Sequence, residues 1–193
     1  MEATNAPSVV CLGFFDGVHQ GHLSLLKAAK EIAREKGLIV CAHTFDRSPG
    51  KKDFPLTSLA RREALLRAAG ADWVAVSPFD EEMRHMSGDA FFRQIVAGRL
   101  NARHVVCGDD HRFGYRGGWD VKDLKSLCES AGIGLTVCPP VTLKDGSRIS
   151  SSAIRSALLR QDFSLAEAML GRPVDEEMRK LAQQAKIENE MLA

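Results

Sequence analysis

Two histidines three residues apart, His19 and His22, stand out among the side chains able to do chemistry in this 193-residue chain. An apolar run precedes them and an amphipathic helical pattern begins near Leu23. The unpaired N–H groups and the dipole at the start of a helix attract phosphate, and Gly21 lets the backbone approach a bulky anion. Imidazoles on adjacent turns could donate hydrogen bonds to phosphoryl oxygens as negative charge develops there. The pattern therefore predicts stabilisation of a pentacoordinate phosphorus.

A His-x-x-His pair can also occur without any part in phosphate chemistry. Such pairs are common on surfaces and in cores, and histidines at this spacing can chelate a metal, although no third ligand follows at a persuasive spacing. A Walker A loop is excluded because no Gly-Lys-Ser/Thr follows. The strand-to-loop-to-helix context, with Gly13, Gly17 and Gly21, favours phosphate binding.

A second cluster, ISSSAIR, combines three serines with an arginine one helical turn later. Ser150, Ser151 and Ser152 precede an apolar helical pattern, and Arg155 follows. One serine is explained by helix capping, and a solvated helix cation is the ordinary role of the arginine. Together, the hydroxyls and the fork-shaped guanidinium suit phosphate oxygens. We interpret them as a clamp on the β- and γ-phosphates, which leave as pyrophosphate.

Two acidic positions could contact sugar hydroxyls or hydrated Mg²⁺. Asp16 opens the loop before the histidines, where it could form an Asx-type turn, organise the loop or lie near Mg²⁺. Gly108-Asp109-Asp110 follows an apolar run, at the expected carboxyl end of a strand. A carboxylate there could hold ribose hydroxyls or a hydrated Mg²⁺, although adjacent acids in a loop are commonly solvated turn residues.

Apolar strand-like runs alternate with amphipathic segments along the chain. Nearly continuous apolar strands separated by helices are typical of a parallel sheet covered on both faces, so we predict an α/β, Rossmann-like doubly wound fold. Ligands bind outside the carboxyl ends of such strands, where the strand order reverses. The expected strands are residues 8–15, 38–45, 72–79, 103–108 and 135–141, and the expected helices are residues 22–37, 58–70, 87–100 and 120–132.

Composition limits the remaining possibilities. The formal net charge is +1, which gives no basic field of the kind that nucleic-acid binders use. No apolar run approaches the length of a bilayer span, and no signal peptide is recognisable. The five cysteines form no C-x-x-C pair, which favours reduced, buried thiols in a cytoplasmic protein. We expect one domain over residues 1–174 and a charged helical extension over residues 175–193.

The motifs resemble a known family. HQGH fits the H-x-G-H signature of the HIGH-motif nucleotidyltransferases, and GFFDGVHQGH is similar to the opening motif of the bacterial FAD synthetases. Further stretches resemble that family in the same order: PLTSLARREALL, SPFDEEMRHMS, HVVCGDDHRFGYRGGWD and RISSSAIRSALLRQDFSLAEAMLGRPV. The family module transfers an adenylyl group from ATP to FMN, giving FAD and pyrophosphate. The resemblance thus implies a nucleotidyltransferase fold, ATP and FMN as substrates, and Mg²⁺ bound with ATP.

The resemblance also suggests which residues form the site. Asp110 matches the family aspartate, and Arg112 either walls the nucleotide site or braces its loop. The expected catalytic residues are His19, His22 and Arg155. The expected substrate-binding residues are Gly13, Phe14, Phe15, Asp16, Gly21, Phe45, Asp46, Gly108, Asp110, Arg112, Ser150, Ser151 and Ser152. We assign no residue to a metal.

Two departures from the family pattern concern the acceptor. HTFDRSPG stands where the family has TFxPHP, so Arg47 and Ser48 replace a proline and a histidine. GRPV is followed by one helical segment, so we expect no riboflavin kinase module in this chain. Two alternatives stay open: an adenylyl- or cytidylyltransferase acting on another phosphorylated acceptor, and a catalytically silent flavin- or nucleotide-binding module.

Overall fold

A five-stranded parallel sheet forms the centre of the protein, here a computed structural model that describes residues 6–50 and 54–191. The strand order is β3-β2-β1-β4-β5, and every neighbouring pair is parallel. The order reverses between β1 and β4, which is where such sheets bind ligands. The predicted Rossmann-like, doubly wound fold is therefore confirmed. The strands are β1 (Ser8–Leu12), β2 (Ile39–Phe45), β3 (Trp73–Ser77), β4 (Ala102–Gly108) and β5 (Gly134–Cys138).

Helices cover both faces of the sheet, and successive side chains of a strand point to opposite faces, so they enter two different cores. Along β1, Val9 and Cys11 join one core with α1 (Gln20–Lys36) and α2 (Leu59–Ala68). Val10 and Leu12 join a second core on the other face. That second core includes the π-helical segment η1 (Phe91–Arg99), which continues α4 (Gly88–Ala90), and α5 (Val121–Ala131).

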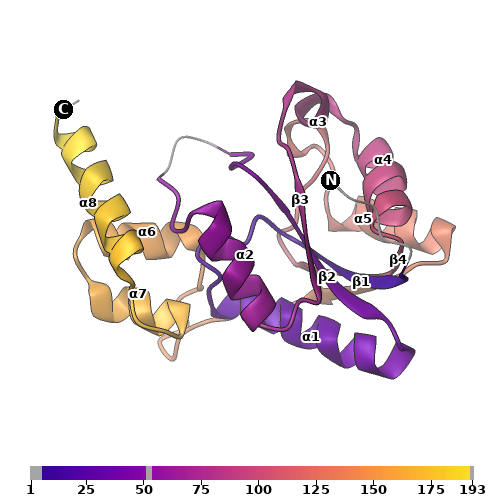
Figure 1. Ribbon diagram of the computed structural model, residues 1–193, viewed down its shortest axis with the longest axis horizontal. Helices are drawn as coiled ribbons and strands as arrows, with labels where there is room; N and C mark the ends of the chain where they lie inside the picture. The colour runs from indigo at the N-terminus through magenta and orange to yellow at the C-terminus, as the bar shows by residue number, and fades with distance from the viewer. Residues whose placement is uncertain (1–5, 51–53, 192–193) are drawn as a thin grey trace.

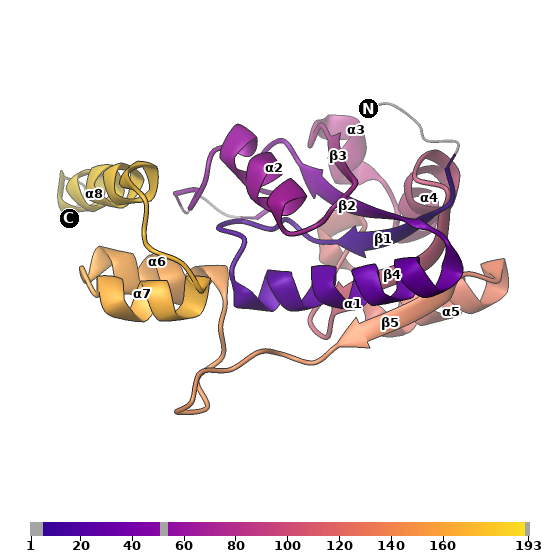
Figure 2. The same cartoon turned by 60° about the horizontal axis from the view of Figure 1, so that its bottom comes forward.

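A third core lies at one end of the molecule, away from the sheet (Figures 1 and 2). It is built from α6 (Ser151–Leu159), α7 (Phe163–Leu170) and α8 (Glu176–Met191), which enclose Leu56 and Ile149. Met178 and Ala182 of α8 are buried in this core. The core thus crosses residue 174, and the division of the chain into residues 1–174 and 175–193 stays a prediction. The two remaining short helices are α3 (Glu81–His85) and η2 (Tyr115–Gly117).

The first strand is shorter than predicted. It ends at Leu12 rather than Phe15, and the chain then forms a loop up to α1. Within this loop Phe15 and Val18 have φ values of 57° and 41°. Such backbone is unfavourable for bulky side chains by about 1–3 kcal/mol each, and it persists only where surrounding contacts enforce it. The apolar character of Phe15 reflects its burial, which is complete, and not a place in the strand.

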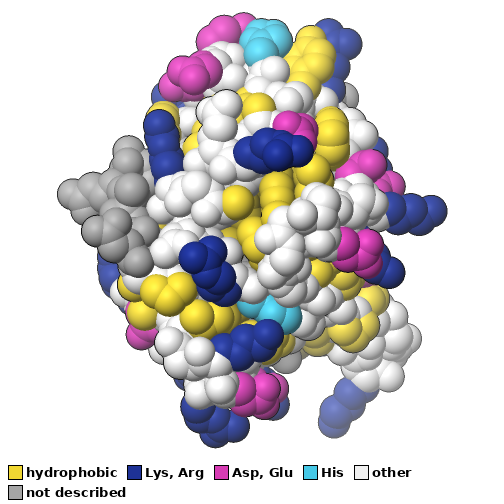
Figure 3. Space-filling model, turned by 90° about the vertical axis from the view of Figure 1, so that its right-hand side faces the viewer, with side chains coloured by type: hydrophobic (Ala, Val, Ile, Leu, Met, Phe, Trp, Pro, Cys, Tyr) yellow, Lys and Arg dark blue, Asp and Glu magenta, His cyan; other side chains and the backbone are white. Residues whose placement is uncertain are grey.

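The distribution of charged side chains and the burial of the cysteines are as expected from the composition. On the face drawn in Figure 3, lysine and arginine side chains are interspersed with acidic ones. All five cysteines are buried free thiols, as predicted. Among the described residues, no helix is both long and apolar enough to cross a membrane.

Candidate active site

The loop between β1 and α1 carries the predicted histidines and is fixed by close packing. The ring of Phe15 folds back over Gly13, where a Cβ atom would lie 3.0 Å from the ring. Phe15 also meets His22 edge to face, with 5.2 Å between the ring centroids. A glycine is therefore required at position 13, because any side chain there would displace the ring that supports the histidine pair.

His19 and His22 lie together at the start of α1. Their rings are stacked, with centroids 3.6 Å apart and planes inclined by 18°. His19 occupies the N-cap position, and its backbone N–H donates to Nδ1 of His22 over 3.4 Å. The side-chain Nδ1 of His19 is buried and has no partner among the described residues. The helix start thus presents a fixed pair of imidazoles with unused hydrogen-bonding capacity.

Both imidazoles are neutral at physiological pH. Burial, and then the positive charge of Arg172, lowers the pKa of His19 to about 4. Burial also lowers the pKa of His22 well below its ordinary value, assisted by His19, Arg172 and Arg62. A neutral imidazole carries one N–H donor, and a bound anion would raise both pKa values by favouring the charged forms. The pair can therefore respond to negative charge that develops beside it.

Asp16 connects this loop to two distant segments. Its carboxylate is 2% exposed and accepts the backbone N–H groups of Leu56 (3.0 Å) and Thr57 (3.3 Å). It also forms an ion pair with Arg155. The backbone carbonyl of Asp16 accepts the hydroxyl of Ser151 over 2.9 Å. Asp16 therefore organises the loop, one of the roles considered for it.

The second predicted cluster adjoins the first. The side chain of Ser150 caps α6 by accepting the N–H of Ala153, and Ser151 begins that helix. A Cβ atom on Gly21 would lie 3.1 Å from the His19 ring and 3.8 Å from the carbonyl oxygen of Ile149. The start of α1 thus lies beside the segment that enters α6. The structure brings the histidine and serine groups together, as the phosphate-site prediction requires.

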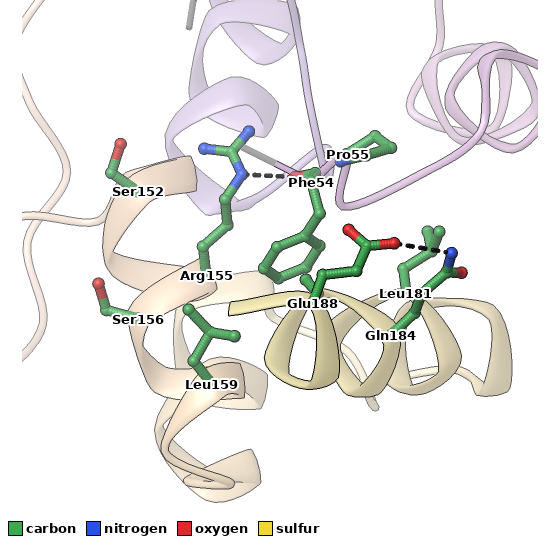
Figure 4. Close-up of a pocket in the computed structure, with 10 residues that line it drawn as sticks. Phe54, Pro55, Ser152, Arg155, Ser156, Leu159, Leu181, Gln184 and Glu188 are labelled. Carbon is green, nitrogen blue, oxygen red and sulfur yellow. Dashed lines mark hydrogen bonds between the residues drawn. The ribbon is translucent and has the colours of Figure 1, made fainter. Parts of the chain in front are cut away.

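Arg155 is held by protein groups in this conformation. Its Nε donates to the carbonyl oxygen of Phe54 over 2.8 Å (Figure 4), and its Nη2 contacts Asp16. Together with Ser152, it lines a cavity of about 490 Å³ between α6 and α8. The interpretation of Arg155 as a phosphate clamp therefore stays a prediction, and it requires the guanidinium to exchange some of these contacts for phosphate oxygens.

A larger cleft of about 860 Å³ opens at the carboxyl edge of the sheet, beside the same loop. Gly13 and Phe14 form its border with the histidine loop, and six phenylalanine and tyrosine rings contribute to its wall. Planar rings of this kind suit stacking against a flat ligand. The aromatic wall consists of Phe14, Phe45, Phe79, Phe91, Phe113 and Tyr115.

Three further histidines, His43, His85 and His111, line this cleft, and the sequence analysis did not single them out. His43 is 1% exposed, and its Nε2 lies 2.8 Å from the hydroxyl of Ser77. Burial lowers the pKa of His43 to about 3 and that of His111 to about 4, so both are neutral. The Nε2 atom of His111 is buried without a described partner. The cleft wall thus carries polar, uncharged nitrogen atoms beside its aromatic rings, together with the charged side chains of Glu81, Arg84, Arg112 and Arg116.

The loop after β4 lies partly at this cleft. Arg112 lines it, and the Nε of Arg112 braces the loop by donating to the carbonyl oxygen of Gly117 over 2.7 Å. Asp109 and Asp110 both pair with Arg148, at 2.8 and 2.9 Å. These exposed pairs contribute little to stability. The predicted ribose contact of Asp110, next to Gly108, stays a prediction.

The residues at the end of β2 and just after it have two roles: some line the cleft, and one braces a neighbouring loop. Phe45 and Ser48 line the cleft, whereas Asp46 accepts the backbone N–H of Phe79 over 2.8 Å. Burial alone would raise the pKa of Asp46, but hydrogen bonds from Phe79 and Arg47 lower it. The Arg47 side chain is 68% exposed and pairs with Asp46. Asp46 therefore braces the loop before α3 in this conformation.

Two arginines that the sequence analysis did not single out complete the loop's surroundings. Arg172 donates to the carbonyl oxygens of Val18 (2.9 Å) and Gly17 (2.6 Å). Arg62 is 2% exposed, and its guanidinium lies 4.3 Å from the centroid of the Phe14 ring. The sequence signal for Arg62 is its place on the inner face of a helix, one turn before a buried leucine. The sequence signal for Arg172 is its place in the GRPV stretch that resembles the family motif.

The described residues contain no cluster of three or more His, Cys, Asp or Glu side chains that could hold a metal ion.

Comparisons with known proteins agree with this geometry. Residues 1–153 match the family model described as FAD synthetase. A curated relative from Pseudomonas fluorescens, named bifunctional riboflavin kinase/FMN adenylyltransferase, is 35% identical over 86% of this chain and 54% of its own length. The chain spans about half the length of the first curated relatives it matches.

Two solved structures are similar in fold to this chain. A crystal structure titled macrolide-efflux protein, from Streptococcus pneumoniae, has a TM-score of 0.80 and 30% identity over 90% of this chain and 58% of its own. Pantoate-beta-alanine ligase from Francisella tularensis has a TM-score of 0.53 at 16% identity, covering 93% of this chain and 77% of its own. The second likeness concerns the fold alone.

Proposed function

Because the chain belongs to the FAD synthetase family, we propose that it transfers an adenylyl group from ATP to FMN, producing FAD and pyrophosphate. The observation that carries this proposal is the junction of two features at one loop. The stacked imidazoles lie at the start of α1, and the aromatic cleft begins at Gly13 and Phe14, a few residues earlier. A flavin ring in the cleft would direct its phosphate toward the histidine pair.

The two substrates occupy different sides of the loop in this proposal. The cleft takes the isoalloxazine ring, which is flat and largely apolar with a polar edge. Phe45 stacks in its wall, while Arg112 supports the loop after β4. ATP lies with its triphosphate between the start of α1 and the start of α6, and Asp110 and Gly108 approach its ribose. Mg²⁺ enters with ATP.

The reaction is an in-line attack of an FMN phosphate oxygen on the α-phosphorus of ATP. The bond to the bridging oxygen breaks, and pyrophosphate leaves without a covalent enzyme intermediate. Chemistry of this type depends on positioning and on stabilisation of charge. His19 and His22 donate to the phosphoryl oxygens in the transition state. Ser150, Ser151, Ser152 and Arg155 hold the departing pyrophosphate.

One assay tests the proposal. The purified chain is incubated with ATP, Mg²⁺ and FMN, and both pyrophosphate and FAD are measured over time. We expect equal amounts of the two products, because one transfer yields one of each. Release of pyrophosphate without FAD would refute FMN as the acceptor. The absence of both products would refute the activity.

Two alternatives can be distinguished in the same experiment. The cleft also carries Ser48 and the neutral histidines His43 and His111. These polar groups suit a polar acceptor other than a flavin better than a purely aromatic wall would. A panel of phosphorylated acceptors, with ATP or CTP as donor, tests that transferase alternative. A catalytically silent module would bind FMN or ATP and release no pyrophosphate from any pair.

A further inference from the structure

Arg62 is a buried cation that forms no ion pair with a described residue. It is 2% exposed, and its Nη2 donates to the carbonyl oxygen of Phe45 over 2.6 Å. Its Nε is buried and has no hydrogen-bond partner among the described residues. A buried charge without a partner costs several kcal/mol, roughly, unless another interaction compensates for it. This arrangement calls for a compensating anion.

Burial lowers the pKa of Arg62, and the carboxylates of Asp16, Glu63 and Asp46 oppose this shift from a distance, but none of them forms an ion pair with Arg62 among the described residues. Three arginines, Arg62, Arg155 and Arg172, contact the segment from Phe14 to Val18. Asp16 is the buried acid of that segment, and Arg155 pairs with it directly. Arg62 therefore keeps a buried positive charge without a direct acidic contact among the described residues. A positive charge of this kind in a partly dehydrated site attracts an anionic ligand.

The position of Arg62 distinguishes between the two phosphate-bearing substrates. Its guanidinium lies 4.3 Å from the centroid of the Phe14 ring and bonds to the backbone of Phe45. Both of these residues line the aromatic cleft. Arg155 and Arg172 instead contact the loop from α6 and from the segment after α7. Arg62 is therefore on the acceptor side of the loop, and the other two arginines are on the side of the serine cluster.

We infer that Arg62 provides the positive charge that attracts and orients the phosphate monoester of the acceptor, from beneath the ring of Phe14. This inference rests on the proposed function. The ring of Phe14 shields the guanidinium from water, which strengthens its field at short range. A modest movement of that ring would turn this attraction into a direct contact. Arg62 is a positioning residue in this scheme, while the imidazoles act on the reacting phosphorus.

The test compares two ligands that differ only in the phosphate. The dissociation constants of FMN and riboflavin are measured by flavin fluorescence for the wild-type chain, Arg62→Met and Arg62→Lys. Loss of one charge-assisted interaction weakens binding by roughly 10- to 100-fold. We expect Arg62→Met to lose that much affinity for FMN, with riboflavin affinity changed less than about twofold. Arg62→Lys should retain part of the difference between the affinities for FMN and riboflavin, because lysine retains the positive charge.

A matched control comes from the same helix. Arg67 is exposed on α2, and its Nη1 donates to the backbone carbonyl of Asp72. Arg67→Met should leave both affinities unchanged. Arg62→Met should melt at or above the wild-type temperature, because an apolar side chain replaces a buried unpaired charge. If Arg62→Met does not fold, the inference is tested on the wild-type chain alone. The inference then requires that the wild-type chain bind FMN at least about tenfold more tightly than riboflavin.

Several results would overturn the inference. These are equal losses of FMN and riboflavin affinity in Arg62→Met, no loss of either, or a loss confined to a non-hydrolysable ATP analogue. A wild-type chain that binds FMN no better than riboflavin would also overturn it. Failure of the proposed function is seen separately, as the absence of FAD formation by the wild-type chain.

Discussion

Replacing Asp16 by asparagine should destabilise the protein more than the loss of one surface charge would. Asp16 is 2% exposed and accepts N–H groups from Leu56 and Thr57. Its other partner is the guanidinium of Arg155. Asparagine offers one acceptor oxygen, and its amide NH₂ group would face donors. The substitution leaves Arg155, whose side chain is 14% exposed, without this carboxylate.

The size of the effect follows from these contacts. Removing one member of a buried ion pair costs about 3–5 kcal/mol, and hydrogen bonds to a charged group contribute about 1.5–3 kcal/mol each. Asparagine retains part of this set, so we expect a loss near 3 kcal/mol in the free energy of unfolding. In a chain of this size that corresponds to a fall of roughly 6–12 °C in Tm.

Urea unfolding followed by circular dichroism gives the free energies. Asp89→Asn is the matched control, because Asp89 pairs with Arg93 on the surface with 44% of its side chain exposed. That exposed pair should contribute less than about 1 kcal/mol. In a double-mutant cycle, adding Arg155→Met to Asp16→Asn should cost less than the sum of the single changes. A loss below about 1 kcal/mol for Asp16→Asn, or additive losses, would refute the reasoning.

Three further predictions concern the histidines and one close approach. His22→Ala should lower kcat by about 10²–10³ with an unchanged circular dichroism spectrum; near-normal turnover would contradict its assigned role. Folding lowers the pKa of His19 to about 4 and of His43 to about 3, from an ordinary value of 6.5. The unfolded chain therefore binds more protons below pH 6.5, so the free energy of unfolding should fall on acidification, by about 1–2 kcal/mol for each such histidine at pH 5. Urea midpoints that do not change between pH 7.5 and pH 5 would exclude this. Gly88→Ala should destabilise the protein by about 1–3 kcal/mol in urea unfolding, because its Cβ would lie 2.3 Å from the Trp119 ring; a neutral effect would show that the ring can move.

Local pattern was enough to predict the scaffold. Apolar runs of β type and helical periodicity identified the parallel sheet and most of its covering helices, because both signals depend on neighbouring residues only. The motif around His19 and His22 located the start of α1 for the same reason. The early end of β1 was not predicted, since packing of Phe15 over Gly13 overrides the local apolar pattern. The π-helical form of η1 was not predicted either.

The surroundings of the loop were decided by tertiary structure. Asp16 and Arg155 are separated by 139 positions in the sequence, and Arg172 reaches Gly17 across 155. No periodicity connects such residues, because their contact depends on how helices from the third core are placed against the sheet. The same holds for Arg62: its charge suggests a surface residue, and only the packing of α2 places it beneath Phe14. The sequence determined which chemical groups are present and on which elements they lie, whereas the fold determined which of them share one small, partly dehydrated volume.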